Sequence, residues 1–156
     1  MTKESQLKWA KPRRRTKHSP KVKLDRKLVG SMGGSGIWSR LVKLKASERC
    51  EVCGSVESLN AHHIEGRRNE ATRYDLKNGV CLCSGCHVFR KQSAHQSPLW
   101  FIEWLKEHRN ADYYYIMTKR NEVKQWAETE LKEILEDYIN LEKELNDQSN
   151  ARKGIG

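Results

Sequence analysis

The sequence predicts an α+β fold in which zinc holds together a small core of two strands and a helix. Two Cys-x-x-Cys pairs, Cys50/Cys53 and Cys83/Cys86, have the spacing of a tetrahedral four-cysteine zinc site. Two short strand-like segments lie in the region that these pairs bracket. Downstream, apolar residues recur at helical spacing as far as Leu145. We therefore expect flanking helices around the core and a long C-terminal helix.

Composition bounds the size of this core. The chain has 156 residues, which suits one domain with extensions, and hydrophobic residues make up 37%. Such a small apolar fraction favours a metal staple. No apolar run approaches the length of a membrane span, and no signal-peptide pattern opens the sequence. We therefore expect no membrane partner.

The cysteines support a metal rather than disulfide bonds. Five are present, and four of them belong to the two pairs, which is typical of a protein in a reducing compartment. The fifth, Cys81, lies in the apolar run Val80-Cys81-Leu82. We expect it to be a buried strand residue.

Positive charge gathers at the N-terminus. The net charge is +10, and residues 1–36 hold eleven Lys and Arg residues against two acidic ones. We expect this segment to be a disordered basic arm that ends in a Gly-rich linker. Arg13, Arg14 and Arg15 would contact phosphate groups without reading the base sequence, so the charge predicts nucleic acid as the partner. The alternative is a solubilising tail.

Residues 37–97 are expected to form the zinc-stapled core. Its first helix would pack an apolar face against the rest of the core. Asn78-Gly79 is a turn signal directly before the second strand. In chain order the expected elements are a helix, two strands and a second helix, at residues 37–46, 59–64, 80–82 and 85–91.

Residues 98–146 are expected to form a helical extension. Ser97-Pro98 predicts a helix start, with Ser97 as the N-cap. The segment 99–105 is apolar nearly all round, which predicts a buried helix, and residues 112–117 would add a short aromatic helix.

A long amphipathic helix is expected over residues 121–145, followed by a frayed tail at 147–156. Its stripe lasts under three heptads, so packing on its own domain is favoured. Self-association, or a phage packaging or recombination partner, is the alternative use of this helix. The stripe consists of Ala127, Leu131, Ile134, Tyr138, Leu141 and Leu145.

A tandem histidine, His62-His63, lies inside the loop that zinc would close, together with Asn78 and His87. Histidine is a suitable general base because its pKa lies near neutrality. Adjacent residues of a strand point to opposite faces, so His62 and His63 should have different tasks. A histidine could also replace one cysteine at the zinc, although four cysteines make this unnecessary.

These motifs together resemble the HNH endonuclease family, also called the ββα-metal or His-Me finger nucleases. The matching segments are A-H-H-I from Ala61, then Asn78, then L-C-S-G-C-H ending at His87. The order of motifs from Ile37 to Leu105 is similar to the phage-type members, including the NinG/Rap-like recombination nucleases. This resemblance implies metal-dependent hydrolysis of DNA, with branched or recombining DNA as a candidate substrate, in a bacterial host cytoplasm.

The resemblance also implies roles for individual residues. His63 corresponds to the general base that activates water, and Asn78 would position it through a hydrogen bond. His62 and His87 correspond to ligands of a catalytic cation. Two protein ligands leave room for water and phosphate, which suits Mg²⁺ or Mn²⁺, beside Zn²⁺ at the cysteines. Lys91 stands where other members carry a further histidine.

Basic residues near the histidines are candidates for binding nucleic-acid phosphates. They are Arg67, Arg68, Arg73, Arg90 and Lys91. Two other functions stay open: a non-catalytic zinc-stapled DNA-binding or packaging adaptor, and an RNA nuclease. An adaptor would explain the cysteines and the charge, but not the histidines with Asn78. His95 and His108 lie outside the pattern and receive no role.

Overall fold

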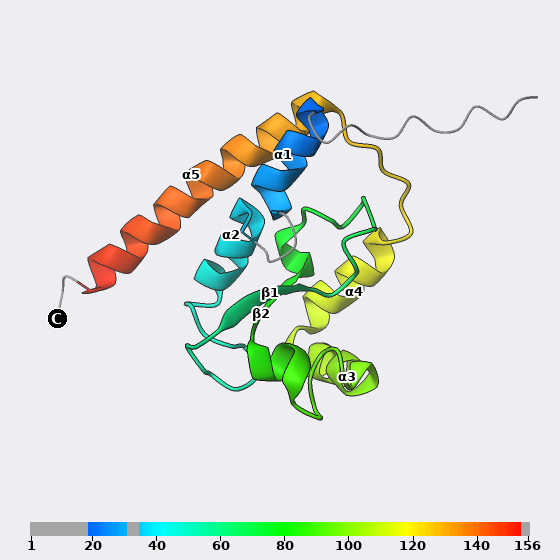
Figure 1. The fold of residues 1–156 in the computed structure, drawn as a ribbon, viewed down its shortest axis with the longest axis vertical. Coiled ribbons are helices and arrows are strands. Elements are labelled where there is room, and N and C mark those ends of the chain that lie inside the picture. Colours follow the sequence, from blue (N-terminus) through cyan, green and yellow to red (C-terminus); the bar gives the residue numbers. More distant parts are fainter. Residues whose placement is uncertain (1–18, 31–34, 154–156) are drawn as a thin grey trace, which may run out of the picture.

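The structure is a computed structural model that describes residues 19–30 and 35–153. The mixture of helices with a small sheet confirms the predicted α+β class. Figure 1 shows the two strands in the middle of the molecule, with α3 and α4 beside them and α5 running along α1 and α2. The elements are α1 (Pro20–Val29), α2 (Ile37–Lys45), β1 (Leu59–His63), the 3₁₀ turn η1 (Leu76–Asn78), β2 (Gly79–Cys83), the π-helical turn η2 (Gly85–Phe89), α3 (Pro98–His108), α4 (Asn110–Lys119) and α5 (Glu128–Lys153).

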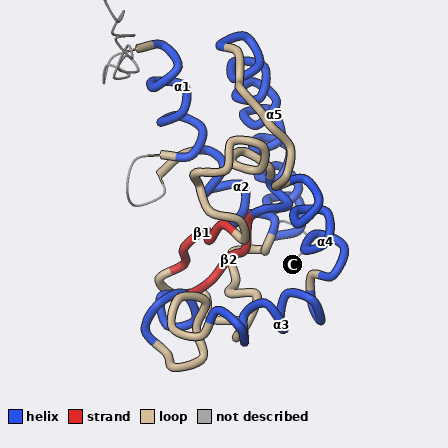
Figure 2. Tube along the Cα trace, turned by 90° about the vertical axis from the view of Figure 1, so that its right-hand side faces the viewer, coloured by secondary structure: helices blue, strands red, loops and turns tan. Residues whose placement is uncertain are grey.

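The two strands pair antiparallel, as Figure 2 shows at the centre of the trace. Leu59 lies opposite Cys83 and His63 lies opposite Gly79, so the tandem histidine sits at one end of the sheet. Helix α2 packs closely against that end: a Cβ atom at Gly79 would clash with the side chain of Val42. Glycine is therefore required where β2 begins.

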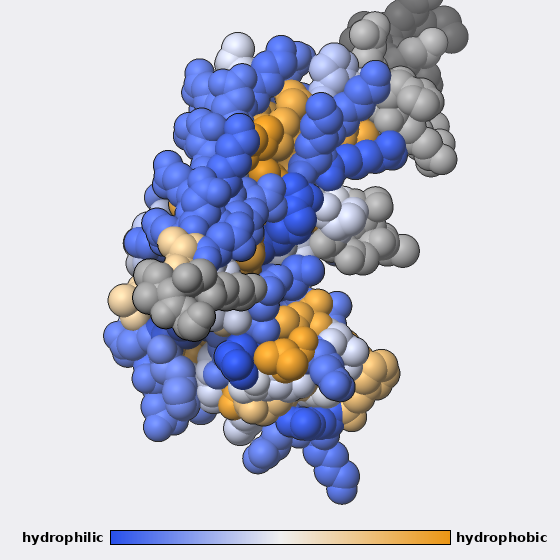
Figure 3. All heavy atoms as spheres, turned by 90° about the vertical axis from the view of Figure 1, so that its left-hand side faces the viewer, coloured by the Kyte–Doolittle hydropathy of each residue, from blue (hydrophilic) through white to orange (hydrophobic). Residues whose placement is uncertain are grey.

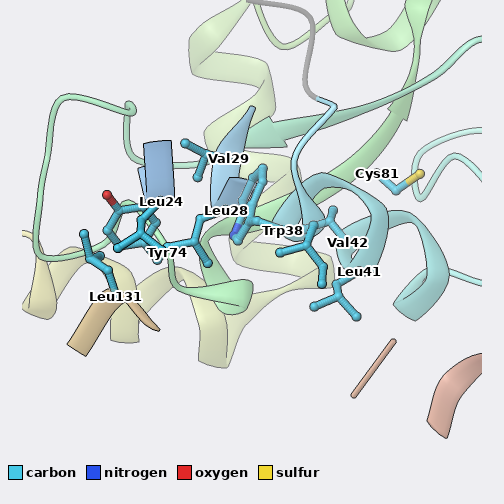
Figure 4. Packing of buried hydrophobic residues seen from close by; sticks show 10 residues of the cluster. Leu24, Leu28, Val29, Trp38, Leu41, Val42, Tyr74, Cys81 and Leu131 are labelled. Carbon is cyan, nitrogen blue, oxygen red and sulfur yellow. The ribbon is translucent and has the colours of Figure 1, made fainter. Parts of the chain in front are cut away.

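Strand β2 is buried on both faces and separates two apolar clusters. Cys81, which is 0% exposed as predicted, belongs to the cluster formed with α1, α2 and α5. Figure 4 shows Leu28, Trp38 and Leu131 of this cluster. Val80 and other β2 residues belong to a second cluster, which contains three of the four paired cysteines and residues of α3. The apolar core is thus divided into two clusters, which the composition did not predict. Hydrophilic side chains cover most of the face in Figure 3.

Helix α1 corrects the prediction of a disordered arm over residues 1–36. Ser19 caps this helix, because its hydroxyl accepts a hydrogen bond from the Val22 amide at 3.4 Å. Leu24 and Leu28, four residues apart, are buried in the core. The prediction failed here because the density of charge outweighed this short apolar stripe. Residues 1–18 and 31–34, including the predicted phosphate-binding arginines of the arm, lie outside the described residues.

Helix α3 begins at Pro98 as predicted, but only one side of it is buried. The Ser97 side chain makes no capping bond. The backbone carbonyl of Ser97 accepts a hydrogen bond from the Phe101 amide at 3.1 Å. The side of α3 that carries Phe101 packs in the cluster that contains the cysteines and is buried, whereas Leu99 is 80% exposed. Burial all round was therefore the wrong expectation, because the short sheet covers one side of this helix. In α4, Ile116 is buried and Tyr114 is exposed.

Helix α5 begins and ends later than predicted, and the expected frayed tail is helical as far as Lys153. The residues before it are held by Trp126, whose Nε1 donates to the Glu70 carbonyl at 2.8 Å. Leu131 is 1% exposed, and other stripe residues pack on the same cluster, so the stripe serves this chain's own fold. None of the described helices has the length and apolar character that crossing a bilayer requires.

Replacing Leu131 with Ala should lower the free energy of unfolding by about 2–5 kcal/mol, since it removes a fully buried side chain and leaves a cavity. The measurement is denaturant unfolding. Ile139→Ala, at a position of the same helix that is 39% exposed, should cost about 1 kcal/mol or less. Equal losses in the two variants would contradict the assigned packing of α5.

Candidate functional site

The four paired cysteines come together as the sequence predicted. Their four sulfur atoms all lie within 4.8 Å of one another, and Cys53 Sγ is 3.7 Å from Cys83 Sγ. Two thiolates bound to one tetrahedral zinc ion at about 2.3 Å lie about 3.8 Å apart. The donor set and its spacing therefore fit zinc. The cluster joins the loop after α2 to the end of β2 and to η2.

Local backbone geometry folds the first pair into a tight knuckle. The Gly54 amide donates to the Cys50 carbonyl at 2.8 Å, and Gly54 has a φ of +74°, which glycine adopts without strain. The Cys50 amide donates to the Ser55 carbonyl at 2.8 Å. In the second pair, the Cys86 amide donates to Cys83 Sγ at 3.4 Å. Such bonds hold sulfur atoms in place for a metal ion.

The fifth cysteine, Cys81, is not part of this cluster. Burial is the largest cause that raises the pKa of its thiol to about 12, and the nearby negative charge of Glu51 is the next largest. A thiol that stays protonated is a poor metal ligand. Cys81 is therefore a packing residue.

A second cluster consists of three histidines. One ring nitrogen each of His62, His87 and His95 lies within 4.8 Å of the others, and Nε2 of His87 is 3.2 Å from Nε2 of His95. Two ring nitrogens bound to one ion at about 2.1 Å, at angles of about 90–109°, lie about 3.0–3.4 Å apart. The three imidazoles could thus hold a divalent cation.

His95 is a residue that the sequence prediction left without a role. The predicted helix over 85–91 is wrong in length, because η2 ends at Phe89 and Arg90 is already extended. The chain then turns back, and the His95 amide donates to the His87 carbonyl at 3.1 Å. His95 thereby comes to the place that a continued helix would have given to Lys91, which is exposed. No glycine or proline marks this break before Pro98.

His63 lies on the other side of β1, as strand alternation predicted. Its ring stacks on Trp38, with ring centroids 3.7 Å apart and planes 13° apart. Trp38 is itself fixed, since its Nε1 donates to the Asp75 carbonyl at 2.9 Å. His63 Nε2 is 3.1 Å from the Arg73 carbonyl oxygen. A carbonyl can only accept, so Nε2 carries the proton and Nδ1 is left as the acceptor nitrogen.

Both histidines of the tandem are uncharged at neutral pH. Burial, with the neighbouring rings of His87 and His95 next in effect, lowers the pKa of His62 to about 3. Burial also lowers the pKa of His63 to about 4, and the charges of Arg67 and Arg73 add to this while the Arg73 carbonyl opposes it. Neutral imidazoles can bind a cation or accept a proton.

Asn78 is placed differently from its predicted role. Its side chain is fully buried, its Oδ1 accepts from the Glu65 amide at 2.7 Å, and its Nδ2 donates to the Glu65 and Thr72 carbonyls. Within the described residues the Arg73 carbonyl, rather than Asn78, bonds to the His63 ring. Asn78 instead closes the loop between the strands, which carries Arg73.

The histidines share a pocket of about 350 Å³, which Trp38 and the end of α1 also line. Lys43 and Arg67 supply positive charge to its wall, and Lys43 was not among the predicted phosphate ligands. Two other predicted phosphate ligands have different partners. Arg73 is paired with Asp25 at 2.8 Å, and Arg90 Nη1 lies 3.4 Å from Cys86 Sγ.

The remaining predicted phosphate ligands stand apart from the pocket lining. Arg68 and Lys91 are exposed, and neither lines the pocket. Arg13, Arg14 and Arg15 lie outside the described residues. Of the arginines and lysines predicted to bind nucleic acid, the structure thus brings Arg67 to the histidines.

Residues 50–92 match the family model described as HNH endonuclease. The match covers both cysteine pairs, the tandem histidine, Asn78 and His87, but less than half of the chain. It supports a nuclease of the HNH family. No curated protein and no solved structure matches the chain. Helices α1 and α2 and the third clustered histidine, His95, lie outside the matched segment.

Replacing Cys83 with Ser should release the metal from the cysteine cluster and unfold the core, because such a site contributes folding free energy directly. Zinc content and circular dichroism measure the two effects. Cys81→Ala is the matched control: it also alters a buried cysteine of β2, and it should keep its zinc. A folded Cys83→Ser protein with full zinc content would contradict the assignment.

Proposed function

We propose that this protein is a metal-dependent HNH endonuclease that hydrolyses phosphodiester bonds of DNA. One observation supports the proposal: His63, whose Nδ1 is left as an acceptor, lines the same pocket as three clustered histidines that could hold a cation. A general base and a cation site side by side are what hydrolysis of a phosphodiester by water requires. The family match points to the same chemistry.

His63 acts as the general base and accepts a proton from water at Nδ1. The Arg73 carbonyl holds the proton on Nε2, and the stacked Trp38 ring fixes the plane of the imidazole. Burial and the nearby arginines keep the free base neutral. When an anionic phosphate enters the pocket, its charge raises the pKa of His63 and thereby favours proton uptake.

His62, His87 and His95 would hold the catalytic cation. When bound, this cation stabilises negative charge on the phosphate and on the leaving 3′ oxygen. The sequence predicted two ligands and hence Mg²⁺ or Mn²⁺. Three imidazoles instead favour a first-row transition metal, so we expect affinity to fall in the order Zn²⁺, Mn²⁺, Mg²⁺. Zn²⁺ at the four cysteines has a structural role.

Lys43 and Arg67, on the pocket wall, bind the phosphates next to the scissile bond. The arginines of residues 13–15 add contacts that do not depend on base sequence. We place the protein in the cytoplasm, where its cysteines stay reduced. Branched DNA, which the resemblance to recombination nucleases implies, belongs among the substrates to compare with plasmid and linear duplex.

Replacing His63 with Ala should lower the cleavage rate of supercoiled plasmid about 10²- to 10⁴-fold, the range for loss of a general base. Wild type and variant are assayed with Mn²⁺ and with Mg²⁺. His108→Ala, which alters a histidine outside the pocket, should cleave normally. Full activity of His63→Ala would refute the base. DNA binding without cleavage by the folded wild type would favour a DNA-binding adaptor.

Replacing His95 with Ala should weaken Mn²⁺ binding to the zinc-loaded protein by at least about tenfold, since even loss of a residue that only orients a ligand costs 10–100-fold. Titration calorimetry measures this affinity. Lys91→Ala, at the position where other family members carry a further histidine, should bind Mn²⁺ like the wild type. Unchanged affinity in His95→Ala would show that two histidines suffice.

A further inference from the structure

Helix α1 lies outside the segment that matches the nuclease family, yet it is bonded to the loop that holds the proposed base. Asp25 of α1 accepts two hydrogen bonds from the Arg73 guanidinium, from Nε and from Nη2, each 2.8 Å long. Asp25 Oδ1 also accepts from the Tyr74 hydroxyl at 2.7 Å. One carboxylate of α1 thus binds two consecutive residues of the loop between the strands.

Arg73 is the residue whose backbone orients His63. Its carbonyl oxygen lies 3.1 Å from His63 Nε2. This part of the loop consists of turns rather than a strand or helix, so regular backbone bonding does not fix the carbonyl. Asn78 holds the neighbouring Thr72 carbonyl, and the Arg73 side chain adds a second anchor, because it bonds to Asp25 on one side and to the Arg67 carbonyl on the other.

The ion pair is well placed to be rigid. The side chains of Arg73 and Asp25 are 17% and 22% exposed, so solvent competes weakly for their bonds. A bidentate pair of this kind fixes orientation as well as distance. Arg67 is held at the same place, since its Nη2 donates to the Gly30 carbonyl at the end of α1 at 2.8 Å.

We infer that Asp25 is a positioning residue for His63: its carboxylate holds the Arg73 side chain, and thereby keeps the Arg73 carbonyl on the Nε2–H group of the base. This inference rests on the proposed nuclease function. It makes α1 a part of the active site, although no atom of Asp25 bonds to the His63 ring in the described structure.

Loss of the Asp25 charge should leave α1 docked, because Leu24, Leu28 and Val29 bury this helix independently of the ion pair. Asp25→Asn keeps the size of the side chain and removes the charge. A matched control is Glu142→Gln, which breaks the bidentate pair between Glu142 and Arg40 that joins α5 to α2. That pair also joins distant segments, but neither partner lines the pocket.

The first readout is the steady-state kinetics of plasmid nicking. Asp25→Asn should lower kcat about 10- to 100-fold and change KM by no more than about twofold, since small misplacement of a catalytic group costs about that much. Glu142→Gln should stay within about twofold of the wild type in both constants. Melting temperatures of the two variants show whether stability accounts for the difference.

The second readout does not depend on cleavage. Nitrogen-15 spectra of the histidine rings in the zinc-loaded wild type, at one fixed pH, should show His63 as a single tautomer with a protected proton on Nε2. In folded Asp25→Asn the two tautomers should be mixed and this proton should exchange faster. Glu142→Gln should give the wild-type spectrum.

An unchanged kcat in folded Asp25→Asn, or an equal loss in Glu142→Gln, would overturn the inference. An unchanged His63 tautomer would overturn it as well. If the wild type cleaves no DNA, the proposed function fails, and the ring spectra alone still decide whether Asp25 positions His63.

Discussion

The cysteine cluster is the constraint on which the site depends. It ties the loop after α2 to the end of β2 and to η2, and three of its four side chains are themselves buried in the second apolar cluster. His87 directly follows Cys86. Ala94, which directly precedes His95, donates its amide to the Cys86 carbonyl at 2.9 Å. A metal ion there would therefore fix two of the three clustered histidines. In a chain with so small a core, a metal ion at this cluster would supplement the apolar packing.

Strand β1 divides the chemistry between its two faces. His62 points toward His87 and His95, while His63 stacks on Trp38 and bonds to the loop. The proposed cation site thus depends on the cysteine side of the molecule, whereas the proposed base, His63, depends on α1, α2 and the loop. The loop between the strands is held by Asn78, Arg73 and Asp25. Each of them bonds to a backbone group of the loop or to another of these side chains.

Much of the fold and of the candidate site could be predicted from the spacing of residues that are close in sequence. The cysteine pairs, the two strands and helix α2 follow from motif spacing and turn signals that act over a few residues. The position of His95 could not be predicted in this way. The helical turn η2 ends at Phe89 without a glycine or proline, and the chain then turns back onto His87. The contact of Asp25 with Arg73 was equally hidden, since the two residues are 48 positions apart and the positive charge around Asp25 suggested disorder. The contact between Asp25 and Arg73 depends on how α1 packs against the loop, and the spacing of residues within α1 does not determine that.

The most direct test is anomalous diffraction from crystals of the zinc-loaded protein soaked in Mn²⁺, measured on both sides of each metal's absorption edge. The account predicts a zinc peak among the sulfur atoms of Cys50, Cys53, Cys83 and Cys86, and a separate manganese peak bound by ring nitrogens of His62, His87 and His95. A single metal peak that shares cysteine and histidine ligands, or manganese bound away from these histidines, would contradict it.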